Sequence, residues 1–286
     1  MFNEKHLKEY LESALERHRI YKRRQAGEPK PWTNNPIFQE YFFCNVFRQY
    51  DKCSKWIIDK VVPYKRFDLI VVYRYISTMS IYNEIDKEGI KPDELDKVQD
   101  LLEEMKRREK TLFNGCFIRN TRIGGGYGEG TEAHKVPFIL IELMRKANAF
   151  EEIRKYDSFE NLVWYLMEFP TIKGFMGYEY ACDWEYTGEF KPIDKYSWAN
   201  KGPGATRGLS LVVHGNQYEN FSYEKWLFYI RELFKEMKKL FNEEFPEEDF
   251  SMREVEHWLC EYQKYVKYKD NRENGTQVKH RKYNGK

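Results

Sequence analysis

The chain has few of the features that mark secreted, metal-binding or membrane proteins. Its five cysteines include no Cys-x-x-Cys pair and no Cys/His spacing typical of a metal site, so we expect free thiols and no bound metal. It contains no apolar run of membrane-spanning length, and its first residues do not resemble a signal peptide. These absences predict a soluble, cytoplasmic protein.

The chain also lacks a large excess of charge of either sign. Its 48 basic residues face 46 acidic ones, which gives a formal net charge of +2. This balance excludes a polycation that coats nucleic acid, so any DNA-binding surface must be a local patch. The basic stretch from Arg17 to Arg24, which includes Arg23, and the basic residues after 268 are candidates for such a patch.

Several catalytic motifs are missing. The Gly-rich stretch Gly124–Gly130 is followed by Thr131 and Glu132, with no Gly-Lys-Ser/Thr ending, so it is not the phosphate-binding loop of a kinase. No HExxH sequence and no zinc-deaminase signature is present. The chain is therefore not expected to be a P-loop kinase or an enzyme of either zinc class.

What the sequence does contain is helical periodicity. Its length of 286 residues allows one large core or two modest ones. We interpret residues 1–268 as a single, mainly α domain and residues 269–286 as a basic, flexible tail. Apolar spacing and capping residues predict these helices: 4–24, 36–57 (with Asn35 as N-cap and Pro36 at N1), 67–85, 93–111, 132–149, 159–169, 177–186, 207–214, 223–242 and 252–268.

Two glycine-containing turns suggest contacts with phosphate. Gly174 and Gly177 lie between two predicted helices, as in a helix–hairpin–helix turn, and Lys173 precedes them. Gly202-Pro-Gly204 opens a helix that carries Arg207, which indicates a second anion site at a helix N-terminus. Ordinary interhelical loops are the alternative interpretation of both turns.

Four blocks of sequence occur in a fixed order: Trp32–Ile37 continuing into Tyr41–Arg48, Gly174–Tyr178 with Asp183, Trp198 with Gly202–Gly208, and Glu254–Tyr265. In these blocks the chain resembles the α-glutamyl/putrescinyl-thymine pyrophosphorylases, a family that includes the helical domain found beside 5-hydroxymethyl-deoxyuridine DNA kinases. Gln263 departs from the acidic residue expected at its position.

The resemblance implies a fold like that of helix–hairpin–helix DNA glycosylases and a role in phage-type thymine hypermodification. The implied enzyme is a transferase that displaces pyrophosphate from activated 5-hydroxymethyluracil in DNA with an amine, such as an amino acid or a polyamine. Its partners would be DNA with a modified pyrimidine and a small amine, in a bacterial cell or a phage-infected host. No cofactor is assigned, and a divalent metal is left open.

This chemistry needs a proton acceptor, fixed cations and an activated ring. Asp183 is our first candidate for the base that deprotonates the amine, followed by Glu256 and His257. A buried cap or ion pair is the alternative role for Asp183. Arg48 is the candidate that stabilises the departing pyrophosphate. Cys44 is a candidate for addition to the pyrimidine ring, although a cysteine is often only a small buried apolar residue.

A flipped base needs a pocket with aromatic faces and polar groups. Trp32, Tyr178 and Trp198 are the aromatic candidates, and each of them could instead belong to the core. The polar candidates come from the matched blocks: Asn45, Glu261 and Lys264.

A DNA glycosylase that excises a modified base, for repair or for defence against phage, is the alternative function. Such an enzyme carries an aspartate roughly twenty residues after its hairpin. In this chain the region reads Trp198–Gly204, and the nearest acid is Asp194, which lies somewhat early.

Overall fold

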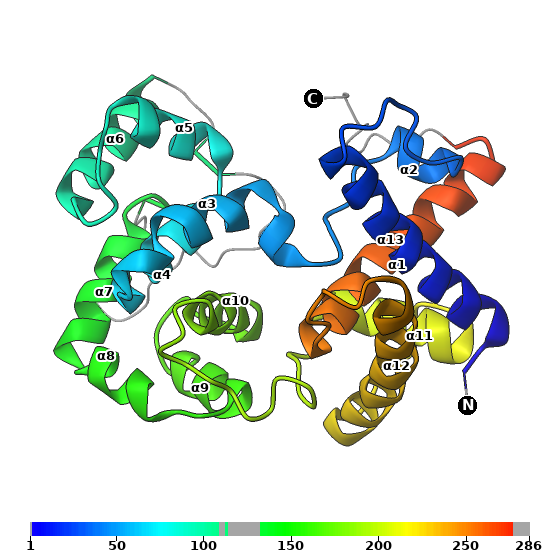
Figure 1. Ribbon diagram of the computed structural model, residues 1–286. Coiled ribbons are helices and arrows are strands. Elements are labelled where there is room, and N and C mark those ends of the chain that lie inside the picture. Colours follow the sequence, from blue (N-terminus) through cyan, green and yellow to red (C-terminus); the bar gives the residue numbers. More distant parts are fainter. Residues whose placement is uncertain (1, 109–111, 114–131, 277–286) are drawn as a thin grey trace. The chain divides into compact units, whose positions relative to one another are not determined.

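The computed structural model describes residues 2–108, 112–113 and 132–276, and every regular element in these ranges is a helix (Figure 1). This confirms the predicted mainly α class. None of the described helices is long and apolar enough to cross a membrane. The Gly-rich stretch Gly124–Gly130 lies outside the described residues. The α-helices of the first half are α1 (Glu4–Gln25), α2 (Pro36–Glu40), α3 (Lys52–Lys60), α4 (Phe67–Ile76), α5 (Met79–Lys87) and α6 (Leu95–Arg107).

The second half continues in the same way, and short 3-10 helices join some elements. Those 3-10 helices are η1 (Arg48–Tyr50), η2 (Val62–Tyr64) and η3 (Ile153–Lys155). The α-helices are α7 (Val136–Lys146), α8 (Ala149–Glu152), α9 (Phe159–Leu166), α10 (Gly174–Glu185), α11 (Pro203–His214), α12 (Tyr223–Glu244) and α13 (Met252–Glu273).

The chain divides into two compact units. The first combines Met1–Arg48 with Lys195–Lys286, and the second is Gln49–Asp194. Sequence analysis treats residues 1–268 as one domain, and it shows no boundary between the units. The reason is that the first unit is built from both ends of the chain, so no long linker of distinct composition separates it from the second.

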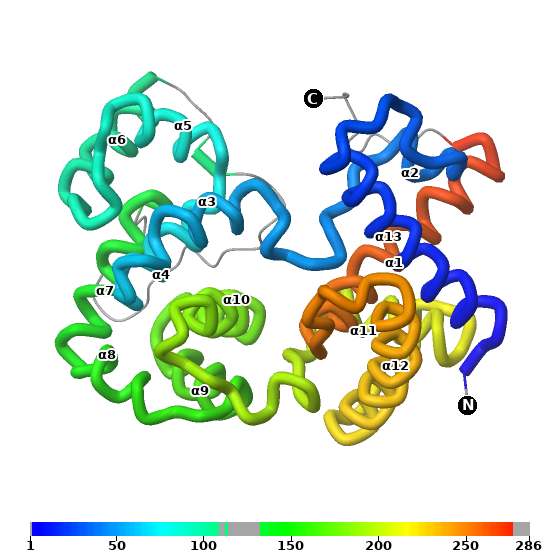
Figure 2. The backbone as a smooth tube through the Cα atoms, viewed as in Figure 1, coloured from blue at the N-terminus to red at the C-terminus, as the bar shows by residue number. Residues whose placement is uncertain are grey.

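In the first unit, α13 is the helix on which the others assemble. It packs against α1, α2, α11 and α12 (Figure 2). The crossing of α11 and α13 is very close, because a Cβ atom on Gly208 would lie only 2.0 Å from the backbone oxygen of Leu259. Helix α11 therefore lies directly on the backbone of α13, and a glycine is required at this position.

Gly208→Ala tests this packing. We expect the variant to lose about 3 kcal/mol of unfolding free energy or more, because two helix backbones must separate to admit a methyl group. Gly177→Ala is the matched control, since its Cβ would make only an ordinary contact of 3.4 Å with Val163. Denaturant unfolding monitored by circular dichroism measures both; equal losses in the two variants would contradict the expectation.

The predicted helix 36–57 is not continuous: it is interrupted after α2, and α3 begins only at Lys52. Asn35 caps α2 as expected, accepting a hydrogen bond from the backbone N–H of Ile37, but α2 ends at Glu40. Residues 41–47 form no helix, because aromatic contacts with α13 hold them instead. The ring of Tyr41 stacks on Tyr268 at 4.3 Å, and that of Phe43 meets the same tyrosine edge-on at 5.8 Å.

The predicted helix 67–85 is also divided, into α4 and α5. Ser77 has a φ of +41°, a left-handed conformation that ends α4, and its N–H bonds to the carbonyl of Tyr73. The hydroxyl of Tyr82 donates to the same carbonyl at 2.6 Å, and the Tyr82 ring stacks on Trp56 at 4.2 Å. Ending α4 at Ser77 lets α5 pack against α3, which buries this aromatic pair; a continuous helix would hold the two rings apart.

In the second unit, α10 packs against α9 and α4, and α4 packs against α7. Gly174 begins α10, and Gly177 lies in its first turn rather than in the preceding turn. A Cβ atom at position 177 would make only an ordinary contact of 3.4 Å with Val163 of α9, so the packing of α10 on α9 does not require a glycine here. Contact of these glycines with phosphate and the glycosylase-like topology stay predictions.

Helix α13 continues past the predicted end at Tyr268. It runs to Glu273, so residues 269–273 are helical and not part of a flexible tail. Ion pairs hold this last part: Lys269 binds Glu9 of α1, and Arg272 binds Glu40 of α2 at 2.8 Å. Residues 277–286 lie outside the described residues.

A buried carboxyl group begins α13 and makes stability depend on pH. Glu254 forms a capping box with Ser251, and burial raises the pKa of its carboxyl group from 4.5 to about 7. Because folding raises this pKa, the folded state binds the proton more tightly than the unfolded state. The associated stability is therefore present at low pH and is lost as pH rises from about 4.5 to about 7.

Glu254→Gln should remove this dependence, because the amide can still accept the capping hydrogen bond and does not titrate. We expect the difference in unfolding free energy between variant and wild type to grow in favour of the variant between pH 4.5 and pH 7. Thermal or denaturant unfolding across this range measures it. A constant difference would show that Glu254 does not titrate there.

Candidate functional site

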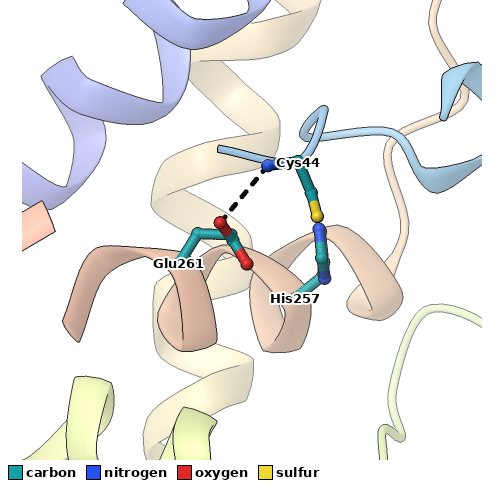
Figure 3. Close-up of side chains that lie close together, drawn as sticks. All are labelled: Cys44, His257 and Glu261. Carbon is teal, nitrogen blue, oxygen red and sulfur yellow. Dashed lines mark hydrogen bonds between the residues drawn. The ribbon is translucent and has the colours of Figure 1, made fainter. Parts of the chain in front are cut away.

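Three reactive side chains meet in the first unit, and we call Cys44, His257 and Glu261 the Cys44 cluster (Figure 3). The sulfur, a ring nitrogen and a carboxylate oxygen of these residues all lie within 4.8 Å of one another. His257 and Glu261 stand one turn apart on α13, and Cys44 comes from the non-helical segment 41–47. The backbone N–H of Cys44 donates to Glu261 Oε2 at 3.3 Å, which attaches that segment to α13.

The imidazole of His257 is neutral at physiological pH. Burial, and then the positive charges of Arg48 and Lys264, lower its pKa well below the ordinary value of 6.5. Its Nε2 atom is buried and has no hydrogen-bond partner within the described part of the chain. A neutral, desolvated imidazole with a free nitrogen is able to accept a proton.

Positive charges surround the cluster. Lys264 Nζ lies 2.5 Å from Glu261 Oε1. Burial acts to lower the pKa of Lys264, but the negative charges of Glu261 and Cys44 raise it above its ordinary value. Arg48 is buried and interacts electrostatically with His257. The structure thus places Arg48 and Lys264, both selected from the sequence, beside the same imidazole.

Arg17 of α1 extends this group of charges, although the sequence placed it only in the basic stretch expected to bind DNA and not in the base pocket. Its guanidinium donates to Asn45 Oδ1 at 2.8 Å and to the carbonyl of Phe43 at 3.2 Å, on either side of Cys44. The helical spacing of the sequence could have identified Arg17, because this residue falls on the same face of α1 as the buried residues Tyr10 and Ala14. A cation at such a position needs a buried acceptor.

An aromatic pocket of about 500 Å³ opens on the same segment. Phe43, which directly precedes Cys44 in the chain, lines this pocket together with Arg17. Trp32 forms a half-buried wall, with Arg24 and Lys30 within 5.1 Å of its ring. The pocket is lined by Arg17, Ile20, Arg24, Lys30, Pro31, Trp32, Thr33, Phe38, Gln39, Tyr41, Phe42 and Phe43.

The predicted DNA contact Arg23 has a local structural role next to this pocket. Its guanidinium binds the backbone oxygen of Trp32 and pairs with Glu16 at 3.2 Å. Arg23 therefore holds the loop that carries Trp32, whereas Arg24 lies over the tryptophan ring itself. Two of the predicted residues, Arg24 and Trp32, thus come together in one pocket.

A thiolate, an imidazole and a carboxylate are also ligands for transition metals, and sequence spacing did not reveal this group. The surrounding cations disfavour a divalent ion, because Lys264 already binds the Glu261 carboxylate. A second group of this type lies in the other unit, where Glu103, Glu132 and His134 are close together. There, Lys135 pairs with both glutamates at 3.1 Å.

The Gly202–Gly204 turn faces α13. A Cβ atom on Gly202 would lie 2.9 Å from Glu256 Oε1, and one on Gly204 would lie 2.5 Å from Cys260 Sγ. The start of α11 thus has a carboxylate and a thiol as neighbours on this side, so the geometry favours helix packing over phosphate binding for these glycines. Glu256 points to α11, not into the Cys44 cluster. Arg207 is exposed on α11.

Asp183, the first candidate for the base, belongs to the second unit and is completely buried. Its two oxygens accept hydrogen bonds of 2.6 Å each from the Arg74 guanidinium. Ser54 accepts two further bonds from Arg74, and Glu179 lies 3.7 Å from it. The geometry favours the ion-pair alternative for Asp183, and in the first unit His257 takes the place of the candidate base.

Asp183→Asn distinguishes the two roles. If Asp183 is half of a buried ion pair, this substitution should lower the unfolding free energy by about 3–5 kcal/mol, because Arg74 keeps its buried charge without a partner. The double variant Arg74→Met/Asp183→Leu, which removes both charges, should recover part of this loss. Denaturant unfolding measures both. A fully stable but inactive Asp183→Asn protein would instead support a catalytic role.

The remaining predicted site residues do not join the cluster. Trp198 is buried in the first unit, with its indole N–H bonded to Tyr223 at 2.6 Å. Tyr178 is buried in the second unit against Phe159. Lys173 is exposed at the start of α10. Asp194, the acid nearest to a glycosylase position, caps α9 through bonds of 2.7 and 3.0 Å to its first backbone N–H groups.

Comparison with known proteins agrees with the resemblance. Residues 4–275 match the family model of the 5-hmdU DNA kinase helical domain. The chain belongs to this family. A similar protein is the 5-hmdU DNA kinase of Bacillus phage SP10, with 25% identity over 91% of this chain and 44% of that protein. The chain thus spans less than half the length of this relative. No solved structure matches it.

Proposed function

We propose that this helical-domain family member is a DNA base-modifying transferase that replaces the pyrophosphate of activated 5-hydroxymethyluracil in DNA with an amine. The name of the phage relative denotes action on 5-hmdU in DNA, which supports a modified pyrimidine as substrate. The present sequence has no Walker motif, so we assign the kinase step to another protein. The step that we assign to this protein is the replacement of pyrophosphate on the activated base by an amine.

The observation that carries the proposal is the aromatic pocket beside the Cys44 cluster. An unstacked base needs an aromatic surface, and the half-buried Trp32 provides one at the pocket wall. The phosphates attached to that base need cations, which Arg17, Arg24 and Lys30 supply in the same pocket. A pocket that is both aromatic and cationic suits a phosphorylated nucleobase.

The Cys44 cluster supplies the groups that amine transfer requires. Departure of pyrophosphate develops negative charge, and the fixed cations Arg48 and Lys264 stabilise it without reorganising. The attacking amine must lose a proton as the carbon–nitrogen bond forms. Neutral His257 accepts that proton through Nε2, which has no other partner in the described chain.

Each group has a fixed position before the substrate enters. Glu261 holds Lys264 through one oxygen and the backbone of Cys44 through the other. Arg17 holds the residues on either side of Cys44. The site is therefore organised in advance, which lowers the cost of reaching the transition state. We keep Lys173 and Arg207 as proposed contacts with the DNA backbone.

Mass spectrometry of nucleosides tests the function. DNA containing 5-hydroxymethyluracil is treated with this protein, a 5-hmdU DNA kinase, ATP and a set of amino acids and polyamines. We expect a thymine nucleoside that has gained the amine, and only when kinase and amine are both present. A released base and an abasic site would instead show a glycosylase, and an unchanged nucleoside profile would contradict both functions.

Trp32→Ala tests the pocket. Loss of one stacking surface costs about 1–3 kcal/mol, so we expect the apparent affinity for activated DNA to fall about 5- to 150-fold. Trp164→Ala is the control, because Trp164 is an exposed tryptophan that lies on α9 and does not line the pocket. Initial rates against DNA concentration give both values. Equal affinities would remove Trp32 from the substrate site.

A further inference from the structure

Cys44 differs from Cys260, the other cysteine in the matched blocks. Cys260 faces Gly204 at the α11–α13 crossing, and burial raises the pKa of its thiol to about 12. Cys260 is therefore a packing residue that keeps its proton. Cys44, which is half-buried like Cys260, directly follows Phe43, a residue that lines the aromatic pocket. Its sulfur lies close to a ring nitrogen of His257, whereas Cys260 faces a glycine. Of these two thiols, Cys44 is therefore the one with a proton acceptor beside it.

The surroundings of Cys44 suit a nucleophile. A ring nitrogen of His257 lies next to the sulfur (Figure 3). The imidazole is more than nine-tenths buried, and its Nε2 has no hydrogen-bond partner within the described residues, so it is free to take the thiol proton. Lys264 interacts electrostatically with Cys44, and positive charge of this kind stabilises a thiolate.

We propose that Cys44 is a covalent nucleophile that adds to C6 of the activated pyrimidine, with His257 as its proton acceptor and Glu261 as the residue that positions both. This inference rests on the proposed function, because it explains how the pyrophosphate is expelled. A group on the methylene at C5 leaves poorly from an intact aromatic ring, and addition at C6 converts the ring into an enolate that can expel it.

The steps balance as follows. The Cys44 thiol gives its proton to His257, the sulfur bonds to C6, and the C5–C6 electron pair moves into an enolate at C4–O4. The enolate then forms a double bond between C5 and the methylene carbon, the carbon–oxygen bond to pyrophosphate breaks, and pyrophosphate leaves with that electron pair and the proton from His257. No oxidant, reductant or further co-reactant is needed.

Amine addition reverses the covalent step. The amine attacks the methylene carbon, its proton passes to the now neutral His257, and the enolate forms again. The enolate restores the C5–C6 double bond and expels the Cys44 sulfur, which recovers its proton. The products are the amine-substituted base, free enzyme and pyrophosphate.

Cys44→Ser tests the proposal, with Cys53→Ser as the matched control because Cys53 is also a half-buried thiol but lies in the other unit. Wild-type protein is mixed with kinase-activated DNA without amine and quenched in denaturant. Intact-mass analysis should show protein plus DNA minus pyrophosphate, and peptide mapping should place the link at Cys44. We expect amine transfer by Cys44→Ser to fall at least about 100-fold, and Cys53→Ser to be unchanged.

A second measurement separates this proposal from the proposed function. Reversible addition of a thiolate at C6 of deoxyuridine in DNA makes C5 nucleophilic, so the hydrogen at C5 exchanges with deuterium in D2O. This exchange needs neither amine nor pyrophosphate. Exchange by wild type that is lost in Cys44→Ser supports the nucleophile even if no amine is transferred. Circular dichroism and thermal unfolding establish that both variants are folded.

Two outcomes would overturn the nucleophile. One is amine transfer by Cys44→Ser at a rate near that of wild type, which would leave the proposed function intact. The other is one equivalent of zinc in purified wild-type protein that is lost in both Cys44→Ser and His257→Ala, because a metal-bound sulfur would make the cluster a metal site. Elemental analysis by mass spectrometry measures the zinc directly.

Discussion

At the crossing of α11 and α13, Gly208 brings one helix onto the backbone of Leu259 in the other. Any side chain at position 208 would enter the space of the Leu259 carbonyl, so this approach requires glycine. Helix α13 also contacts α1, α2 and α12. The crossing therefore fixes which face of α13 meets which neighbour, and the candidate site depends on that orientation.

Two faces of α13 contact different parts of the first unit. Glu256 and Cys260, one turn apart, lie against the start of α11. His257 and Glu261, which follow them by one residue each, face the segment that carries Cys44. A helix places residues four apart on the same face. The pair 256 and 260 therefore faces α11, and the pair 257 and 261, one residue later, faces the candidate site. This explains why two adjacent residues of one block, Cys260 and Glu261, have unrelated surroundings.

Buried charge is compensated in both units, with different consequences. In the second unit, Arg74 and Asp183 satisfy each other completely, so the pair is suited to holding helices together. In the first unit, Lys264 is paired while the nearby His257 stays neutral with a buried, unbonded Nε2 in the described chain. Of these two arrangements, only the one in the first unit leaves a group, His257, that is able to exchange a proton. We therefore propose that catalysis takes place there.

Local features of the sequence determined the helical class, most helix positions and the Asn35–Pro36 cap, because periodicity and capping act over a few residues. Sequence blocks also indicated the family and several members of the site. Tertiary structure decided the rest. The end of α2 at Glu40 follows from aromatic contacts with α13, and the burial of Asp183 follows from Arg74, which lies 109 positions away. Cys44 and Glu261 are 217 positions apart, and only helix packing brings them together, since no local preference specifies which distant side chains share a face.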